Sequence, residues 1–181
     1  MLKRKLNAVA SLLTTVLLLA HAILLSVYML SGGRSFRPAG FMGWVLMGVM
    51  ICHALVSIDL ALSAHVEENT RKGKQYPKLN IPTILQRITG LLMVPAAALH
   101  IAGATGAMVP PKMVHAIVPP LFFGIVLAHT ALSAGKALIT LGIGNPKFLK
   151  TFNLIIWLIC GATWIAGVIG IYLRTFVEGA V

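Results

Sequence analysis

Five long apolar runs, separated by short polar segments, dominate the hydropathy pattern of this chain. A helix of about 20 residues, rising about 1.5 Å per residue, crosses the roughly 30 Å hydrocarbon core of a bilayer, and every run reaches that length. The pattern predicts five transmembrane helices, over residues 7–30, 39–65, 83–108, 113–141 and 148–175. We therefore expect an all-α membrane protein, a helical bundle in which residues 1–181 form a single transmembrane domain.

Glycine and proline mark where these runs end. Ser31-Gly32-Gly33 closes the first run, and Pro110-Pro111 separates the third from the fourth. The longest connection, from Glu67 to Ile81, is rich in lysine and arginine. Pro95 and the pair Pro119-Pro120 lie inside predicted helices, where each proline removes a backbone hydrogen bond. Kinks are expected in the third and fourth helices.

Composition agrees with a membrane protein. The 181 residues are 58% hydrophobic and 10% charged, whereas a soluble domain has about one quarter charged residues. The net charge is +11, but the Lys and Arg residues lie at the ends of the apolar runs, where they meet lipid headgroups and partner proteins. We expect no nucleic-acid partner. The first run has no small-residue cleavage site, so it is expected to be a retained helix and not a signal peptide.

The distribution of Lys and Arg predicts the orientation. Three precede the first helix, five lie in or beside the second connection and three lie around the fourth, whereas the alternate segments carry two, one and one. Segments rich in Lys and Arg stay in the cytoplasm. The pattern predicts a multi-pass protein of the inner (cytoplasmic) membrane with a cytoplasmic N-terminus and an outer C-terminus. A soluble partner is expected to dock on the long basic connection.

Four of the six histidines lie deep inside predicted helices, one in each of the first four: His21, His53, His100 and His129. An ionisable ring inside a membrane is costly and marks a functional site by default. The acidic residues of the chain are Asp59, Glu67, Glu68 and Glu178. These acids are too few, and mostly too near helix ends, for a carboxylate-bridged metal site or an acidic proton relay.

Haem is the cofactor that four such histidines fit best. Two imidazoles on facing helices complete a six-coordinate haem iron, so four helices predict two haems. The chain has no CxxCH motif, so covalently attached c-type haem is not expected. His21 and His100 lie about 21 and 26 Å from the cytoplasmic ends of their predicted helices, and His53 and His129 about 18 Å. This favours an outer pair, His21 with His100, and an inner pair, His53 with His129.

Other interpretations of the histidines stay open. Any one of them alone is also explained by a hydrogen bond to a backbone carbonyl between helices. His65 and His115 lie at the membrane boundaries, where an amphipathic ring is tolerated without a ligand role. We do not assign them to iron, although either could border a quinone or a haem propionate.

The histidines occur in a family pattern. His100 follows the segment Gln86-Arg87-Ile88-Thr89-Gly90 by ten residues, and His129 stands in residues 128–135, Ala-His-Thr-Ala-Leu-Ser-Ala-Gly. Together with His21 and His53 this resembles the cytochrome b subunit of succinate:quinone and quinol:fumarate oxidoreductases, in its five-helix, two-haem form. The resemblance covers the first four helices.

The resemblance implies two haem b groups paired as above and a quinone substrate, expected to be menaquinone. It also implies an iron-sulfur subunit and an FAD-containing flavoprotein on the cytoplasmic face, so the chain would be the membrane subunit of an oxidoreductase and not an enzyme alone. Candidate cofactor-binding residues are Arg87, Gly90 and Lys136: the glycine lets a macrocycle or a helix approach, and Arg87, with Lys136 similarly placed at the inner end of its helix, can pair with a propionate. No catalytic residue is assigned. The glutamates that some relatives use for proton transfer are missing, since Val126 and Leu127 closely precede His129.

Two competing functions follow from the same residues. The chain could be the cytochrome b subunit of another quinone-linked complex, such as a hydrogenase or a molybdenum reductase. It could instead be a small transporter whose histidines line a polar path, although the halves of the sequence show no inverted repeat. The fifth helix has no histidine and is expected to pack against the histidine-bearing helices.

Overall fold

The computed structural model of the chain describes the backbone of residues 2–31, 37–70, 81–104, 107 and 112–177. Within these ranges it describes the side chains of all residues except 37–40, 64–70, 104, 112–113 and 115. Most of the long basic connection and the side chains of His65 and His115 therefore lie outside the described residues.

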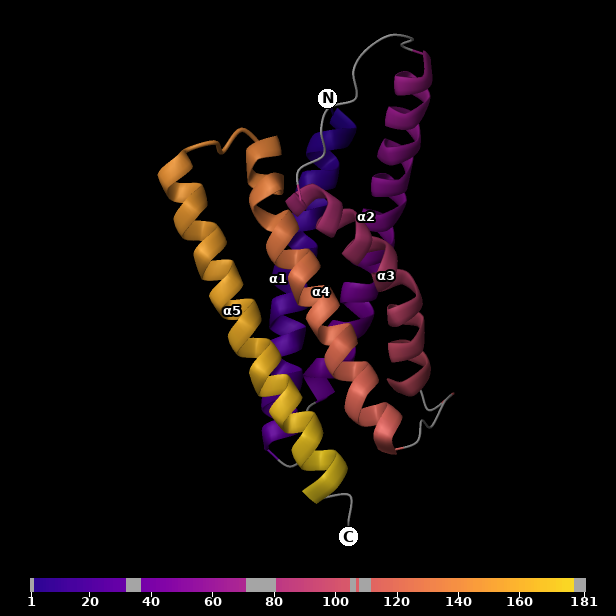
Figure 1. Cartoon of the computed structure of the whole chain (residues 1–181), viewed down its shortest axis with the longest axis vertical. Coiled ribbons are helices and arrows are strands. Elements are labelled where there is room, and N and C mark those ends of the chain that lie inside the picture. Colours follow the sequence, from indigo (N-terminus) through magenta and orange to yellow (C-terminus); the bar gives the residue numbers. More distant parts are fainter. Residues whose placement is uncertain (1, 32–36, 71–80, 105–106, 108–111, 178–181) are drawn as a thin grey trace.

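Five long helices and a short π-helical segment make up the described chain (Figure 1). They are α1 (Leu2–Leu30), α2 (Arg37–Thr70), α3 (Ile81–Ala104), α4 (Lys112–Thr140), α5 (Pro146–Tyr172) and η1 (Leu173–Val177). Each long helix contains an apolar stretch long enough to cross a membrane, and no strand occurs among the described residues. The predicted all-α fold with five transmembrane helices is confirmed.

Several helix ends differ from the predicted ones by a few residues. The first helix already begins at Leu2, and the second continues to Thr70. The sequence pattern places those ends where the apolar run stops, but a helix can continue through charged residues beyond the hydrocarbon. The third helix is described as far as Ala104, and residue 107 is not helical, whereas the predicted helix continues to residue 108.

The start of α5 shows how local sequence sets a helix end. The Oδ1 atom of Asn145 accepts hydrogen bonds from the backbone N–H groups of Lys147 (3.0 Å) and Phe148 (3.2 Å), and Pro146 occupies the first turn. Asparagine as N-cap followed by proline is a favoured start. Before it, Gly142 adopts φ +95°, which a residue without Cβ tolerates best. The α4–α5 connection is therefore a tight turn.

Helices α1 and α4 pack against each other at the centre of the bundle, and the other three helices lie on two sides of this pair. On one side α5 packs against both, as expected of a helix without a histidine. On the other side α2 packs against α1, and α3 against α4. Among the described residues, α2 with α4 and α1 with α3 are not among the closely packed pairs. Figure 1 also shows α3 changing direction along its length; this helix contains Pro95.

The buried core lies mainly among α1, α4 and α5, with one residue, Leu46, contributed by α2. It consists of Leu18, Leu46, Val126, Leu127, Ala131, Ala134, Ile156 and Cys160. Ala134 has no exposed surface at all, which reflects the close approach that small residues allow between membrane helices. In contrast, α3 has no buried residue in its apolar stretch. A cavity lined by residues of α1, α2, α3 and α4 lies on the side of the bundle that contains α2 and α3.

Candidate functional site

His53 of α2 and His129 of α4 line one cavity of about 410 Å³. Their helices are not closely packed against each other, so the two imidazoles face a common space instead of a helix interface. The three residues that the sequence predicts as cofactor contacts, Arg87, Gly90 and Lys136, line the same cavity. Five of the seven predicted site residues are therefore brought together.

Most of the other residues that line the cavity have polar side chains, and the sequence alone assigns none of them to the site. They are Arg4, Asn7, Ser11, Ser57, Thr83, Gln86, Ser133 and Thr140. Two of these residues could have been identified from their spacing relative to the histidines. Ser57 follows His53 by one helical turn and Ser133 follows His129 by one, so both lie on the face of the histidine. A polar face at helical spacing inside an apolar run therefore indicates the cavity.

The cavity is positively charged. Arg4, Arg87 and Lys136 line it from three different helices, and none of the residues lining it is acidic. Lys136 is half-buried, and its Nζ donates hydrogen bonds to Gln86 Oε1 (2.5 Å) and Thr83 Oγ1 (3.1 Å). An anionic group entering the cavity would meet up to three cations.

The ring of His129 is held by the first part of α3. Its Nδ1 lies 3.1 Å from the backbone oxygen of Gln86 and 3.1 Å from Oγ1 of Thr89. The ring also lies against Gly90, where an added Cβ would come within 3.0 Å of His129 Cε1. Only glycine leaves that space for the ring at this distance.

His53 is less tightly held. Its Nδ1 is buried and makes no hydrogen bond of standard geometry with a described residue, although the backbone of Asn7 is close enough to interact with the ring. One turn further along α2, Ser57 donates a hydrogen bond of 3.0 Å to Asn7 Oδ1. These contacts connect the His53 face of α2 to the beginning of α1.

The other two histidines form a second group. His21 and His100 are close enough to interact electrostatically, although their helices are not closely packed. The His21 ring lies against Gly43 of α2, where an added Cβ would approach Cε1 to 3.3 Å. His100 stacks on Phe122 of α4, with ring centroids 5.1 Å apart and an interplanar angle of 29°. Each histidine group therefore contains one ring packed against a glycine of the neighbouring helix.

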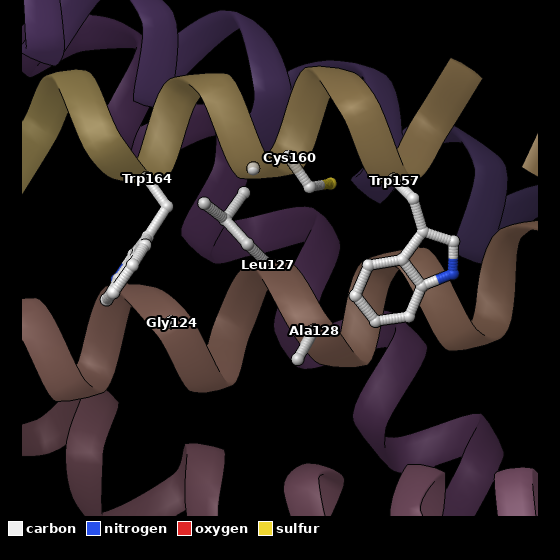
Figure 2. Close-up of a pocket in the computed structure, with 7 residues that line it drawn as sticks. Gly124, Leu127, Ala128, Trp157, Cys160 and Trp164 are labelled. Carbon is white, nitrogen blue, oxygen red and sulfur yellow. The ribbon is translucent and has the colours of Figure 1, made fainter. Parts of the chain in front are cut away.

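A separate apolar pocket of about 150 Å³ lies between α4 and α5 (Figure 2). Trp157 and Trp164 frame its two ends, and Leu127 and Cys160 lie between them. The indole of Trp164 donates a hydrogen bond of 3.0 Å to the backbone oxygen of Pro120. No histidine lines this pocket, so it does not belong to either histidine group.

Within the described part of the chain, no three His, Cys, Asp or Glu side chains gather closely enough to hold a metal ion by themselves. A structural zinc site uses four such ligands. The histidine groups offer two imidazoles each, and this number is sufficient only where another molecule supplies the remaining metal ligands.

Comparison with known proteins gives no assignment: no family model, no curated protein and no solved structure matches the chain. The resemblance to the cytochrome b subunit thus stays a prediction, based on the motifs and the placement of the histidines.

Proposed function

We propose that this chain is a di-haem cytochrome b that anchors a respiratory complex of the succinate dehydrogenase or fumarate reductase type to the membrane. In this proposal it passes electrons between a cytoplasmic iron-sulfur and flavoprotein pair and a membrane quinone, expected to be menaquinone. The observation that carries the proposal is the placement of His53 and His129 on one cavity between helices that do not pack together.

The residues present fit a haem. Two imidazoles supply its two axial ligands, and the porphyrin supplies the other four. The cations Arg4, Arg87 and Lys136 that line the cavity match a cofactor bearing two carboxylates. His21 and His100 would hold the second haem. Bound haem would supply reversible one-electron transfer, while the chain provides ligation, burial and charge.

The charge distribution supports the proposal that the inner histidine pair lies nearest the cytoplasmic face of the membrane. Arg4 near the N-terminus, Arg87 near the start of α3 and Lys136 near the end of α4 line the cavity of the inner pair. These helix ends belong to the side of the bundle that is richer in Lys and Arg, and this side is expected to be cytoplasmic. The inner haem would therefore lie nearest the iron-sulfur subunit.

A reduced-minus-oxidised spectrum with haem stoichiometry on the purified protein tests the proposal. We expect two haem b groups per chain, and one haem in each of the variants His53→Ala and His100→Ala, with different spectra remaining. A protein without haem b contradicts the proposal and favours the transporter alternative. Co-purified flavin supports a succinate dehydrogenase or fumarate reductase complex, whereas co-purified nickel or molybdenum subunits identify a different quinone-linked complex.

A further inference from the structure

The segment from Gln86 to Gly90 contacts the imidazole of His129 through three of its residues, and its role is not explained by the proposed function alone. Gln86 and Thr89 each place an oxygen 3.1 Å from Nδ1 of His129, and Gly90 leaves space for the ring. All three belong to two turns of one helix, so their positions relative to one another are fixed by the helix itself.

The hydrogen-bond pattern determines which ring nitrogen carries the hydrogen. The backbone oxygen of Gln86 can only accept, so Nδ1 of His129 must be the donor in that contact. The hydroxyl of Thr89 has a single hydrogen, and the carbonyl of Leu85, 2.8 Å away, is its nearest acceptor. The lone pairs of Oγ1 therefore remain available to the His129 N–H.

The glycine makes this contact accessible. Within a helix a carbonyl already accepts one backbone hydrogen bond, and its second lone pair is reached only where side chains allow an approach. An alanine Cβ at residue 90 would lie 3.0 Å from Cε1 of His129, tighter than ordinary carbon contact. The ring can reach the Gln86 oxygen because residue 90 has no side chain.

We propose that Gln86 and Thr89 are positioning residues that hold the Nδ1–H of His129, so that Nε2 is the nitrogen offered to iron, and that they thereby lower the reduction potential of the haem bound there. The inference rests on the proposed function. A hydrogen bond from the outer nitrogen of a ligand histidine fixes its orientation and raises its basicity. A more basic imidazole stabilises the ferric state more than the ferrous state.

Thr89→Val tests this, because valine keeps the shape of the side chain and removes the hydroxyl acceptor. We expect ferric haem at His129 to be bound about tenfold more weakly, within the usual range for loss of an outer hydrogen bond, with ferrous binding little changed. For a one-electron couple this corresponds to a rise in the midpoint potential of about 59 mV. Thr89→Ser restores the acceptor and should return the potential to the wild-type value.

Thr130→Val is the matched control. Thr130 lies beside His129, is buried, and donates its hydroxyl to the backbone oxygen of Val126 in its own helix, 2.9 Å away. Its substitution should leave both haem potentials unchanged. The haem at His21 and His100 is an internal control in every sample, because its stoichiometry and potential report whether the bundle is folded.

Three results would overturn the inference: an unchanged inner potential in Thr89→Val, an equal shift in Thr130→Val, or no recovery in Thr89→Ser. If Thr89→Val loses both haems, Thr89→Ala provides the same comparison with a smaller side chain. A wild-type protein that binds no haem refutes the proposed function itself, which is a different result from two haems whose potentials ignore residue 89.

Discussion

The inner and outer histidine pairs have different surroundings in the same bundle. His53 and His129 face a cavity lined by three cations and several hydroxyl and amide groups, and His129 is held by two oxygen atoms of α3. The described contacts of His21 and His100 include a glycine and the ring of Phe122. Polar groups and fixed charges thus line the cavity of the inner pair, and ring packing is the feature described at the outer pair.

If each pair binds a haem as proposed, this contrast would give two chemically identical haems in one bundle different properties. The ligand type would then be the same at both sites, so any difference in haem potential would come from hydrogen bonds, nearby charges and burial. The inner site supplies all three kinds of influence. In the proposed complex, the reduction potentials of the two haems could therefore be set independently of each other.

The largest expected effect comes from removing histidines two at a time. His53→Ala with His129→Ala should leave one haem per chain, because both changes affect the same site. His53→Ala with His100→Ala should leave none, because each change removes a ligand from a different site. Haem stoichiometry and spectra of the purified double variants measure this. If the first double variant lost both haems while the bundle remained folded, the division into inner and outer pairs would be wrong.

A smaller effect is expected from placing a methyl group beside each ring. An added Cβ would approach Cε1 of His129 to 3.0 Å at Gly90, and Cε1 of His21 to 3.3 Å at Gly43. Overpacking of this kind costs about 1–3 kcal/mol, and the closer contact should cost more. We expect Gly90→Ala to accelerate loss of the inner haem to a soluble apoprotein acceptor more than Gly43→Ala accelerates loss of the outer haem.

Two other glycines give matched controls for this prediction. At Gly48 of α2 and Gly103 of α3, an added Cβ would meet nothing within 4 Å. Alanine there changes only the helix preference, which favours alanine by about 1 kcal/mol. Equal haem loss from a control variant and from Gly90→Ala would show that the contact with His129 does not matter.

A charge substitution tests the electrostatic part of the comparison. Lys136→Gln removes a cation from the inner cavity, and a positive charge stabilises the reduced form of a nearby haem. At a separation of about 10 Å and an effective dielectric constant of about 20, one charge is worth roughly 1–2 kcal/mol. The inner potential should therefore fall, and a redox titration should show the outer potential unchanged.

Arg174→Gln removes a cation from the opposite end of the bundle and serves as the control. Its guanidinium lies over the ring of Tyr28, 5.0 Å from the centroid, and it does not line the inner cavity. A fall of the inner potential in this variant as large as in Lys136→Gln would mean that net charge, and not the cavity, sets the potential.

The fold was predictable because it depends mainly on the length and hydrophobicity of each apolar run, which can be read directly from the sequence. The exact helix ends were not, since α1 continues into its basic N-terminal residues and α2 continues to Thr70. The depth calculation that separated the histidine pairs depended on those ends. The pairs are better distinguished by cavity lining and by proximity, and a one-dimensional distance along a helix contains neither.

The candidate site was partly predictable from short motifs and from positions near helix ends. Arg87 and Gly90 belong to a short motif, and Lys136 is identified by its position at the inner end of its helix. All three line the cavity. The role of Thr89 beside His129 depends on how α3 and α4 meet, and no spacing along the chain encodes that contact. Arg4 precedes the first apolar run, so the sequence alone relates it to the orientation of the chain and not to the cavity that it lines.

The smallest expected effect concerns the outer pair alone. Phe122→Leu keeps an apolar side chain of similar size but removes the ring on which His100 stacks, with centroids 5.1 Å apart. Aromatic pairs contribute about 0.5–1.5 kcal/mol beyond their buried area, so outer haem retention should fall by up to about tenfold while the inner haem is unaffected. Phe148→Leu is the control, because it removes one ring of a stacked pair within α5, with centroids 6.0 Å apart. If Phe122→Leu released the inner haem instead, the stacking contact would belong to the inner site, and the contrast between a polar inner pair and a packed outer pair would fail.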